Sequence, residues 1–488
     1  MADDTIVAPA TAPGESAVAV VRVSGPAALA LAARHFRGSR SPEATPSHHI
    51  LYGRFVDSDG APVDSVLLSV FRAPHSYTGE DVVEISSHGG AVIPGGILDA
   101  LVRSGGRPAR PGEFTERAFR NGKLDLAQAE SVAGLVRARS ESAARAARAT
   151  LGGAVSRRVA RLDAALVELL AEVEARIDFP ADASEPLDGT ALAARCGSVA
   201  AEIEPWLEGV PSARRRESGV SVVLAGPPNV GKSSLLNALV GFDRAIVSAT
   251  PGTTRDTVES AVWLDGIEVR LTDTAGIRAS DDPVERLGIA RAESALEATD
   301  LAVVVLDRSD PEASVGALGR RVPEPAERRA PELAERAAPV VVAWNKADLA
   351  RSSGGNGSGR AKKHAETPAR SWAGTVLEDR SIVAEVETVA IEPGGAATLR
   401  DALRACLPML LGAAAGEEAP ATSARQEALL AEALESIRRA RAALLDDASY
   451  DLIAVDLTDA RRALGEIVGR GVDQDVIAAI FSRFCIGK

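Results

Sequence analysis

The pattern of apolar and polar positions divides this chain of 488 residues into regions of different texture. Up to about residue 118, valine-rich runs such as "AVAVVRVSG" and "DSVLLSVF" are bounded by turn residues, which predicts strands. In the same region "HSYTGEDVVEISSHGGAV" is typical of a loop, a strand and a Gly-Gly turn. The first region is therefore expected to be α+β.

Two long segments show helical periodicity instead. From residue 124 the chain is rich in alanine and leucine, and Gly152 and Gly153 are expected to break this stretch before Pro180 ends it. A second helical segment begins near residue 423. Its apolar stripe includes Leu429, Leu430, Ala433, Leu434 and Ile437. Because the ends of a domain often lie close together, the two segments predict one discontinuous helical domain that contains an insertion.

The inserted region, about 219–411, alternates strand and helix signals. "VSVVLAG", "VRLTDTAG", "LAVVVLD" and "PVVVAWNKAD" are continuous apolar runs, which are typical of strands buried in a parallel sheet. Residues 310–338 and the string "ARSSGGNGSGRAKKHAETPARS" lack such patterns, and the second is expected to be a disordered surface insertion.

Composition narrows the class of protein. Hydrophobic residues make up 46% and charged residues 25%, as in soluble globular proteins, and the length suggests roughly three domains. No run approaches a membrane span, and the first 25 residues lack the features of a signal peptide. Cys196, Cys406 and Cys485 lie far apart without a CxxC pair, which argues against zinc or disulfides and suits the cytoplasm.

The formal net charge of -13 opposes tight binding of nucleic acid by the whole surface. Basic clusters nevertheless occur at 214–216 and along the arginine-rich stretch 137–161. Arginines on a long helix are most often only a solvated face. If RNA is involved, we expect it to be held locally or by a partner.

The string "GPPNVGKSS" at 226–234 fits the phosphate-loop pattern G-x-x-x-x-G-K-[ST]. It follows a predicted strand and precedes the helical run "SLLNALV", which is the context that this motif requires. The glycines let backbone N–H groups close around phosphate oxygens, Lys232 supplies positive charge, and Ser233 can ligate Mg²⁺. The motif predicts a site for a nucleotide phosphate chain.

Two further motifs belong beside a Mg²⁺–triphosphate. "DTAG" ends a predicted strand, where Asp273 can reach Mg²⁺ through water and Gly276 can meet a γ-phosphate. "GTTRD" lies between the phosphate loop and "DTAG", and it offers Thr253 or Thr254 as a switch residue that closes on Mg²⁺.

The motif "NKAD" indicates which base is bound. The carboxylate of Asp348 can accept hydrogen bonds from guanine N1–H and from the 2-amino group. Adenine offers no such pair and would leave a buried charge unpaired. In this order the four motifs resemble those of the translation-factor-like GTPases and predict a Ras-like G domain.

The residue after "DTAG" is Ile277, where Ras-like GTPases carry a glutamine that orients the attacking water. Either hydrolysis is slow or another group does this work. Asn229 and the loop "SATPGTT" can hold a monovalent cation near the β- and γ-phosphates, where an arginine finger otherwise supplies charge. Glu285 is a candidate for positioning the water, and the alternative is an ordinary carboxylate at a helix start.

Taken together, these strings resemble the family of tRNA-modifying GTPases called MnmE or TrmE, the tRNA uridine-5-carboxymethylaminomethyl modification GTPases. The resemblance extends from "DTIVAPATAPG" through "TGEDVVEI", "HGG", "RPGEFTERAFRNGKLDLAQAE" and "IDFP" to the GTPase motifs and the final "FCIGK". It covers nearly the whole chain, and it is most specific at 110–130 and in the last five residues.

This resemblance implies a multidomain α/β and α+β fold. Residues 1–118 are expected to form an α+β domain that dimerises and binds folate, and residues 119–215 and 412–488 the helical domain. A Ras-like G domain with a mostly parallel sheet, at 216–411, is inserted between the two helical parts.

The resemblance also implies a function. The family adds an aminomethyl-type group at C5 of the wobble uridine of certain tRNAs, with one carbon from 5-formyl-tetrahydrofolate or a related tetrahydrofolate. It works as a homodimer with the FAD- and NADH-dependent protein MnmG, in a heterotetramer. Its GTP hydrolysis is activated by K⁺-dependent dimerisation of the G domains. The expected cofactors are therefore GTP, Mg²⁺, K⁺ and a folate, the expected partners include tRNA, and the expected location is cytoplasmic without a membrane.

Residue by residue, the catalytic glutamate of the family matches Glu285, and Asn229 and Lys232 complete the expected catalytic set. The folate positions match Arg22, Glu84, Lys123 and Lys488. Mg²⁺ is expected on Ser233 and Thr254, and K⁺ on Asn229, Ser248, Thr250 and Thr253. The residues expected to bind GTP are Asn229, Val230, Gly231, Lys232, Ser233, Ser234, Ser248, Ala249, Thr250, Pro251, Gly252, Thr253, Thr254, Asp273, Thr274, Ala275, Gly276, Asn345, Lys346 and Asp348.

Each folate match has a plainer alternative. Arg22 can pair with a neighbouring carboxylate, Glu84 can be a charge at a strand edge, and Lys123 can be a helix-start residue. A competing function is a GTPase whose first domain is only a scaffold, acting in ribosome or RNA assembly. The strings "RPGEF" and "FCIGK" favour the tRNA-modifying enzyme, because an assembly GTPase has no need of them.

One motif departs from the family pattern. The serine-alanine pair expected after the last strand of the G domain is replaced by Ala390 and Ile391. The insertion at 351–371 leaves the register of that strand open. Asp348 is still expected to dominate guanine recognition.

The final "RFCIGK" is expected to belong to a site, with Gly487 letting Lys488 reach the first domain. Nothing in the sequence shows a base or a depressed thiol pKa for Cys485, so we expect it to line the site without covalent chemistry. The alternative is that Cys485 is buried and packs between Phe484 and Ile486.

Overall fold

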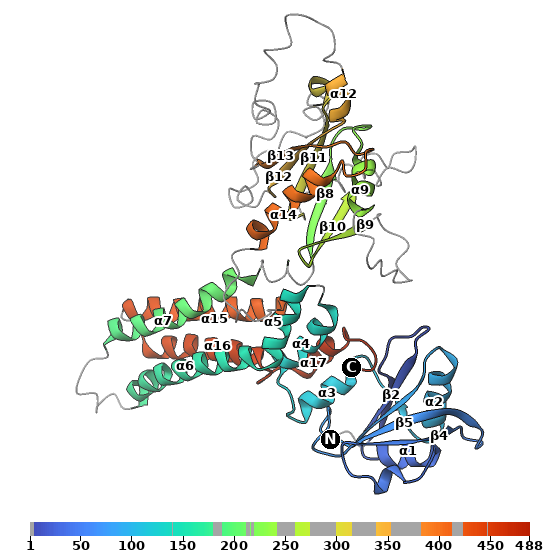
Figure 1. Ribbon diagram of the computed structural model, residues 1–488. Helices are drawn as coiled ribbons and strands as arrows, with labels where there is room; N and C mark the ends of the chain where they lie inside the picture. Colours follow the sequence, from blue (N-terminus) through green and yellow to red (C-terminus); the bar gives the residue numbers. More distant parts are fainter. Residues whose placement is uncertain are drawn as a thin grey trace, which may run out of the picture. The chain divides into compact units, whose positions relative to one another are not determined.

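The computed structural model describes residues 4–138, 140–178, 188–210, 215, 219–241, 259–273, 299–314, 338–352, 382–411, 423–446 and 448–488. The chain forms two compact units, which differ in colour in Figure 1 because they use different parts of the sequence. The first unit comprises residues 1–137, 145–210 and 418–488, and the second comprises 138–144 and 211–417. The beginning and the end of the chain thus share one unit.

The first unit opens with a seven-stranded sheet of order β3-β4-β5-β6-β2-β1-β7, antiparallel except between β1 and β7. Its sides differ: Val66, Leu68 and Val70 are at most 1% exposed, whereas Leu67 between them is 48% exposed. Helices α1 and α2 cover the buried face. The elements are β1 (Ile6–Pro9), β2 (Val18–Ser24), α1 (Ala28–His35), β3 (Phe36–Gly38), the 3-10 turn η1 (Pro42–Ala44), β4 (His49–Val56), β5 (Pro62–Phe71), β6 (Val82–His88), α2 (Val92–Arg103) and β7 (Arg107–Pro108).

A buried ionic network anchors α3 (Glu113–Arg120), the helix that follows this sheet. Glu113 accepts hydrogen bonds from both terminal nitrogens of Arg107, at 2.5 and 3.1 Å, and from the backbone N–H of Arg110 at 2.7 Å. Burial raises the pKa of Glu113, but the hydrogen bonds from Arg107 and Arg110 outweigh it and lower this pKa to about 2. Arg117 extends the network to Glu80 at 3.1 Å.

Replacing Glu113 with glutamine should destabilise the first unit by roughly 3 kcal/mol at pH 7, because each unit of pKa shift corresponds to about 1.4 kcal/mol. The folded pKa of about 2 lies below the ordinary 4.5, so the stabilisation is complete above pH 4.5 and is lost as the pH falls through 2. Urea unfolding should therefore show a difference in the free energy of unfolding between wild type and Glu113→Gln, and this difference should become smaller as the pH falls from 7 to 3. Glu168→Gln, at a side chain that is 74% exposed, is the control; a gap independent of pH would contradict the assignment.

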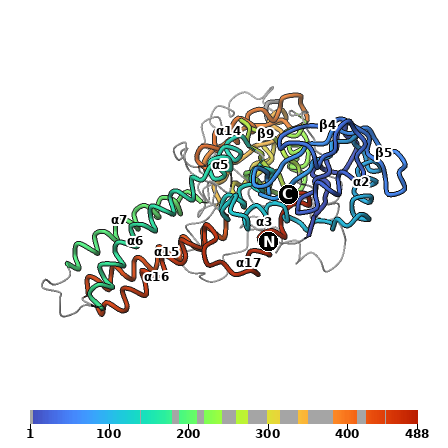
Figure 2. Tube along the Cα trace, turned by 90° about the horizontal axis from the view of Figure 1, so that it is seen from below, coloured from blue at the N-terminus to red at the C-terminus, as the bar shows by residue number. Residues whose placement is uncertain are grey.

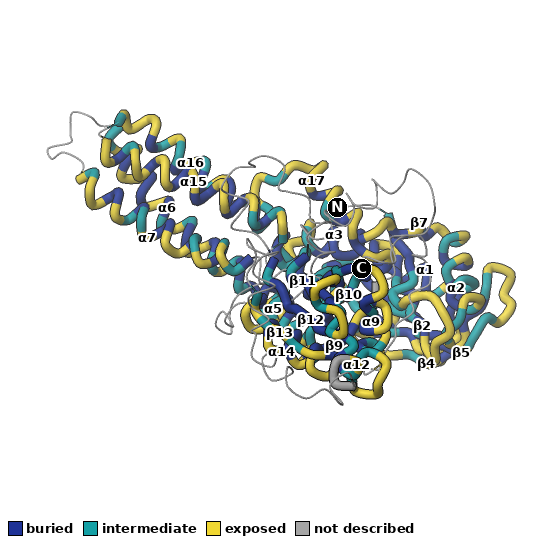
Figure 3. The backbone as a smooth tube through the Cα atoms, turned by 90° about the horizontal axis from the view of Figure 1, so that it is seen from above, coloured by how far each residue is buried: buried dark blue, intermediate teal, exposed yellow. Residues whose placement is uncertain are grey.

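The helical part of the first unit combines segments from both sides of the insertion. Helices α6 and α7 run beside α15 and α16 (Figures 1 and 2), and Leu166, Ile203, Leu430 and Leu457 of these four helices are all 0% exposed. Figure 3 shows buried positions along the inside of this bundle and exposed ones outside. The helices are α4 (Leu126–Arg137), α5 (Glu141–Leu151), α6 (Ala154–Asp178), α7 (Gly189–Glu208), α15 (Ala424–Leu445), α16 (Tyr450–Ile467) and α17 (Gln474–Phe481).

The second unit is built on a six-stranded sheet of order β13-β12-β11-β8-β10-β9, parallel except between β9 and β10. Helices α9 and α14 share a core with β8, β10 and β11. Ligands bind at the carboxyl ends of the strands in such sheets, where the order of the strands reverses. The elements are β8 (Val220–Ala225), α9 (Lys232–Gly241), β9 (Glu259–Leu264), β10 (Ile267–Asp273), β11 (Leu301–Asp307), β12 (Val340–Asn345), α12 (Ala347–Ser352), β13 (Ile382–Glu387) and α14 (Ala397–Leu411).

The predicted fold class, α/β and α+β with a mostly parallel G-domain sheet, is confirmed. The four predicted apolar strands are β8, β10, β11 and β12. Gly152 and Gly153 do separate α5 from α6, whereas Pro180 and most of the two loose segments lie outside the described residues. Among the described helices, none is both long and apolar enough to span a membrane.

Candidate functional site

The loop after β8 is closed by two glycines with positive φ. Gly226 has φ 142° and Gly231 has φ 96°. A Cβ on Gly226 would lie 2.2 Å from the carbonyl oxygen of Val305, and one on Gly231 would lie 2.3 Å from Nδ2 of Asn345. No side chain fits at either position, so the loop lies tightly against β11 and β12 as it enters α9. The first N–H groups of that helix have no helical partner, which suits them to an anion.

Lys232 is held across this loop. Its side chain is 6% exposed, and Nζ donates to the carbonyl oxygens of Gly226 at 3.0 Å and Pro227 at 2.7 Å. These bonds fix the ammonium inside the curve of the loop. A phosphate oxygen would be a stronger acceptor than these neutral carbonyls, because a hydrogen bond between two charged groups is about twice as strong as one between neutral groups.

Ser233 and Asp273 meet beside the loop. The Ser233 hydroxyl donates to Oδ2 of Asp273 at 2.6 Å. Asp273 ends β10, and in the parallel ladder it pairs with Leu224 of β8. Hydroxyl and carboxylate oxygens are the ligands that Mg²⁺ prefers, so the predicted pair is brought together in a suitable arrangement.

Asn345 ties the phosphate loop to the last strands of the sheet. It is 2% exposed, and its Nδ2 donates to the carbonyl oxygen of Val230 at 2.8 Å. Its Oδ1 accepts from the backbone N–H of Ala390 at 3.0 Å and from the Thr388 hydroxyl at 3.2 Å. The altered Ala390 therefore still adjoins "NKAD" through its backbone, and the register left open by the sequence is set by the parallel pairing of β12 and β13.

Lys346 and Asp348 follow at the end of β12. Lys346 has φ 61°, and its Nζ lies 2.6 Å from Oδ2 of Asp307 at the end of β11. Burial raises the pKa of Asp307, but hydrogen bonds from Lys346 and Ser309 outweigh it, so the net pKa lies below its usual value. Asp348 is half-buried in the first turn of α12, and its carboxylate makes no hydrogen bond to any described residue.

The remaining predicted nucleotide and metal residues cannot be placed. Ser248, Ala249, Thr250, Pro251, Gly252, Thr253, Thr254, Thr274, Ala275, Gly276, Ile277 and Glu285 all lie outside the described residues. Within the described part, Asn229 sits at the tip of the phosphate loop with φ 65° and an exposed side chain, Val230 is buried, and Ser234 is exposed in the first turn of α9.

In the first unit, Arg22 of β2 and Glu84 of β6 lie directly opposite each other in the sheet. Nε and Nη2 of Arg22 both lie 2.8 Å from Oε1 of Glu84, with side chains 16% and 28% exposed. The Arg22 guanidinium also faces the rings of Tyr77 and Phe114, at 5.4 and 5.6 Å from their centroids. Arg22 thus forms an ion pair with a neighbouring carboxylate, as the non-functional alternative predicted. The second oxygen of that carboxylate, Oε2 of Glu84, has no partner among the described residues.

The chain end adjoins this pair. Nη1 of Arg22 donates to the carbonyl oxygen of Gly487 at 3.2 Å. The backbone N–H of Phe114 donates to the Lys488 carbonyl at 3.2 Å, and the backbone N–H of Gly112 to the Cys485 carbonyl at 3.3 Å. The tail therefore reaches the first domain through main-chain oxygens of Cys485, Gly487 and Lys488, whereas the sequence predicted contacts of both the ammonium and the carboxylate of Lys488.

Lys123 lies apart from this cluster. It is exposed, and its Nζ donates to the carbonyl oxygen of Pro74 at 3.0 Å. Its side chain packs against Gly79, in the same loop that carries Tyr77. Arg22, Glu84 and the tail are brought together, whereas Lys123 borders their site only through this loop.

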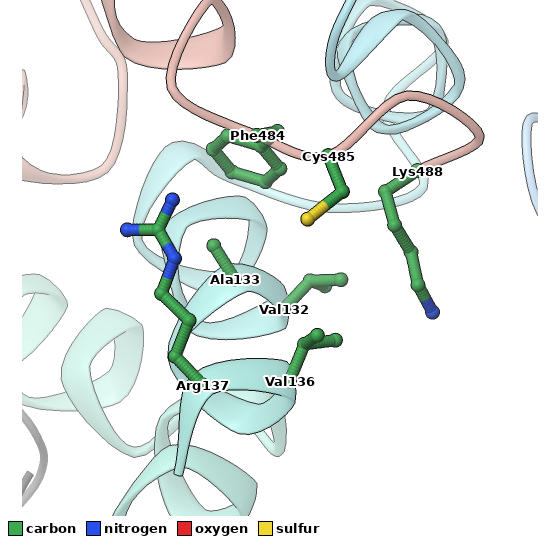
Figure 4. A pocket seen from close by; sticks show the side chains of 7 residues that line it. All are labelled: Val132, Ala133, Val136, Arg137, Phe484, Cys485 and Lys488. Atoms are coloured by element: carbon green, nitrogen blue, oxygen red, sulfur yellow. The ribbon is translucent and has the colours of Figure 1, made fainter. Parts of the chain in front are cut away.

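Cys485 is exposed, so the alternative in which it packs as a buried residue is wrong. Phe484, in contrast, is 8% exposed and packs with Phe481 against Leu126. Figure 4 shows the Cys485 sulfur turned toward Val132 and Ala133, at a hollow of about 10 Å³ that has room for little more than one water molecule. The hollow also involves Val136, Arg137 and Lys488.

Sequence reasoning did not assign Tyr77, Phe114, Asp307 or the Gly487 carbonyl to a site. Tyr77 and Phe114 occur in or next to strings that carried the family resemblance, which was an available signal. Burial raises the pKa of Tyr77, and its hydroxyl is paired with that of Thr115 at 2.8 Å. That both rings lie near the Arg22 guanidinium could be recognised only once the distant segments were brought together in the fold.

Comparisons with known proteins identify the family of this chain. Residues 5–123 match the family model "GTP-binding protein TrmE N-terminus", and residues 126–485 match "MnmE helical domain". A protein of Chloroflexus aurantiacus is 41% identical over 100% of both chains. Proteins of Symbiobacterium thermophilum (41% identical, 100% of both chains) and Syntrophotalea carbinolica (39% identical, 100% of this chain and 99% of the relative) are equally similar. All three relatives carry the name tRNA modification GTPase MnmE.

Proposed function

This chain belongs to the MnmE family of tRNA modification GTPases, and from that membership we propose that it hydrolyses GTP to drive a change at the wobble uridine of tRNA. The change is the addition of an aminomethyl-type group at C5, with one carbon taken from a tetrahydrofolate. The observation that carries the GTPase part is the gathering of Lys232, the Ser233–Asp273 pair and Asn345 around one loop at the carboxyl edge of the sheet.

The oxygen atoms at this loop suit the two proposed cations. The hydroxyls of Ser233 and Thr254 would hold Mg²⁺ directly, and Asp273 would reach it through water. The Mg²⁺ would stabilise negative charge on the phosphates. Asn229 would hold K⁺ with Ser248, Thr250 and Thr253. Its side chain is exposed at the loop tip and forms no hydrogen bond to a described residue, so its oxygen is available.

The protein groups that act on GTP are proposed as follows. Lys232, already directed inside the loop, binds phosphate oxygens and offsets the charge that develops on them. Asp348 accepts hydrogen bonds from the guanine N1–H and 2-amino group. Its carboxylate is available for this because it forms no hydrogen bond to any described residue. Glu285 positions the attacking water in place of the glutamine that Ile277 replaces.

GTP hydrolysis should be at least about tenfold faster in KCl than in NaCl at equal ionic strength, because a bound cation takes the place of an arginine finger. Asn229→Ala should remove this difference while leaving the rate in NaCl nearly unchanged. Steady-state phosphate release by the full chain measures both rates. Asn237→Ala, in α9 beyond the loop, is the control. Equal rates in the two salts for the wild type would contradict the K⁺ site.

For the folate we propose a division of roles between Arg22 and Glu84. All three guanidinium nitrogens of Arg22 already have partners, whereas Oε2 of Glu84 is available. A pterin presents neighbouring N–H donors, which Glu84 can accept, and Arg22 orients that carboxylate. Lys123 and Lys488 are then left for the glutamate carboxylates of the folate.

The family resemblance further supports a homodimer formed through the first domain and a heterotetramer with the FAD-dependent protein MnmG. It also supports a cytoplasmic location, since tRNA is modified there. These proposals and the domain limits of 118, 215 and 411 rest on the same membership.

The function is tested in a strain that lacks the gene. We expect its tRNA to lose a wobble-uridine modification by mass analysis, the full chain to restore it, and Glu285→Ala to fail to restore it while still binding GTP. The purified protein should also capture a flavoprotein. Unchanged tRNA together with a defect in ribosome assembly would overturn the proposal in favour of the scaffold GTPase.

A further inference from the structure

The helices α5 and α6 carry an uninterrupted stretch of positive charge. Between Glu141 and Asp163 the chain has five arginines, at 145, 148, 157, 158 and 161, and no acidic residue. The whole chain has a net charge of -13. This local excess of positive charge is therefore opposite in sign to the net charge of the whole chain.

Several other exposed arginines of this helical bundle are paired with carboxylates, whereas Arg441 of α15 has no such partner among the described residues. Arg195 bonds to Glu172, Arg438 to Glu204 at 2.9 Å, and Arg462 to Glu466 at 2.8 Å. This is the usual arrangement on a solvated helix face, in which acids i±4 or on a neighbouring helix balance the charge.

Three arginines of the stretch have no such partner. Arg145 and Arg161 are exposed and form no hydrogen bond or ion pair with any described residue. Arg157, also exposed, donates to the backbone carbonyl of Gly152 at 2.7 Å. We call these three residues the arginine patch.

Arg158 is different and shows the local repulsion. It packs on the ring of Trp206, with 4.6 Å from guanidinium carbon to ring centroid. Burial lowers the pKa of Arg158, the nearby negative charge of Glu202 raises it, and the positive charge of Arg161 lowers it, so that the net pKa lies below its usual value. Arg158 and Arg161 are therefore close enough for their charges to act on one another, and Glu202 offsets part of that repulsion at Arg158.

The spacing of the patch suits a chain of phosphates. Arg157 and Arg161 are four residues apart in α6, so they lie on one face. Arg145 lies in α5, which ends at Leu151 and is separated from α6 by two residues. At 1.5 Å per helical residue the three side chains fall within about 30 Å, a length over which an RNA strand presents several phosphates.

The surroundings argue against a protein partner. Between residues 141 and 162, all of which are described, no large hydrophobic side chain is exposed. Protein interfaces need an apolar centre with anchoring side chains. Interfaces with nucleic acids are polar and strongly positive.

We propose that the arginine patch binds the phosphate backbone of tRNA. This rests on the proposed function, since it names where the substrate of that reaction is held. Phosphate contacts position a nucleic acid without reading its sequence, so the patch orients tRNA and leaves recognition of the uridine to other groups.

The test compares two full-length variants that lose the same charge. Arg145→Gln/Arg157→Gln/Arg161→Gln removes the patch, and Arg195→Gln/Arg438→Gln/Arg462→Gln removes three paired arginines elsewhere on the bundle. Binding of unmodified tRNA, purified from the deletion strain, is followed by fluorescence anisotropy from about 0.05 to 0.3 M salt. Thermal unfolding checks both variants, and Arg145→Gln/Arg161→Gln, which breaks no hydrogen bond, is used if the triple variant unfolds.

We expect the patch variant to bind tRNA at least about tenfold more weakly than the wild type. The slope of log binding constant against log salt concentration should be shallower by about 2, because each of the three lost phosphate contacts contributes roughly 0.7. The control should change less than about threefold, and GTP hydrolysis without tRNA should be equal in both. Equal losses in the two variants, no loss in the patch variant, or no tRNA binding by wild type would overturn the proposal. So would normal tRNA binding with lost capture of the flavoprotein.

Failure of this proposal can be distinguished from failure of the proposed function. Failure of the wild type to restore the modification would remove the proposed function, while a difference in tRNA affinity between the two variants would still establish the patch.

Discussion

Replacing Asp348 with asparagine should lower the affinity for GTP at least about 100-fold and create affinity for xanthosine triphosphate. In the proposed site the carboxylate accepts two hydrogen bonds from guanine N–H groups, and charged hydrogen bonds of this kind are each worth about 1.5–3 kcal/mol. An asparagine side chain keeps one acceptor and replaces the other with a donor, which opposes the guanine 2-amino group. Xanthine carries a carbonyl oxygen at that position and accepts the new donor.

The structure makes this a clean change. Asp348 forms no hydrogen bond to a described residue, so its replacement leaves the loop contacts of Asn345 and the Lys346–Asp307 pair intact. Competition with a fluorescent guanine nucleotide and with xanthosine triphosphate measures both affinities. Asp310→Asn, after β11, is the control. Normal GTP binding by Asp348→Asn would show that another group selects the base.

Replacing Gly487 with alanine should release the tail and weaken tetrahydrofolate binding more than tenfold. Gly487 has φ 93°, and a Cβ there would lie 2.0 Å from the carbonyl oxygen of Pro9. Strain from φ alone is about 1–2 kcal/mol, and the contact with a backbone oxygen cannot be relieved by moving a side chain. The bonds from Arg22 and Phe114 to the tail carbonyls should then be lost.

Gly471→Ala is a matched control, because Gly471 has φ 71° but no atom within 4 Å of its Cβ position. Gly471→Ala therefore introduces the backbone strain of a positive φ without a steric clash at the new Cβ. Titration with 5-formyl-tetrahydrofolate and hydrogen exchange of residues 482–488 are the measurements, and GTP hydrolysis should be unchanged in both variants. If Gly487→Ala behaves like Gly471→Ala, the tail has no part in the folate site.

Much of the fold could be predicted from local pattern. The buried strands β8, β11 and β12 are nearly continuous apolar runs, whereas β10 alternates apolar and polar residues. The break at Gly152 and Gly153 follows from the cost of two glycines in a helix. Strand β13 was harder to predict, because its burial alternates and it lies between the insertion at 351–371 and the altered pair Ala390 and Ile391.

The candidate nucleotide site was also predictable, because its residues occur in short contiguous strings. Lys232, Ser233 and Asp273 lie where the motifs place them. The hydrogen bond from the Asn345 side chain to the Val230 carbonyl was not predicted, because it depends on contact between loops that follow two different strands.

The sequence by itself determined what is local: most of the strands and helices, the phosphate loop, the position of the carboxylate proposed to read the base, and the family. Each is encoded within a few neighbouring residues by periodicity or by the chemistry of a short motif. The tertiary structure alone decided the contacts between distant segments. Arg22 meets Gly487, 465 residues later, through a backbone carbonyl that every residue possesses and no sequence pattern marks. The arginine patch likewise differs from the paired arginines only in what lies opposite it, and pairing between separate helices is fixed by packing.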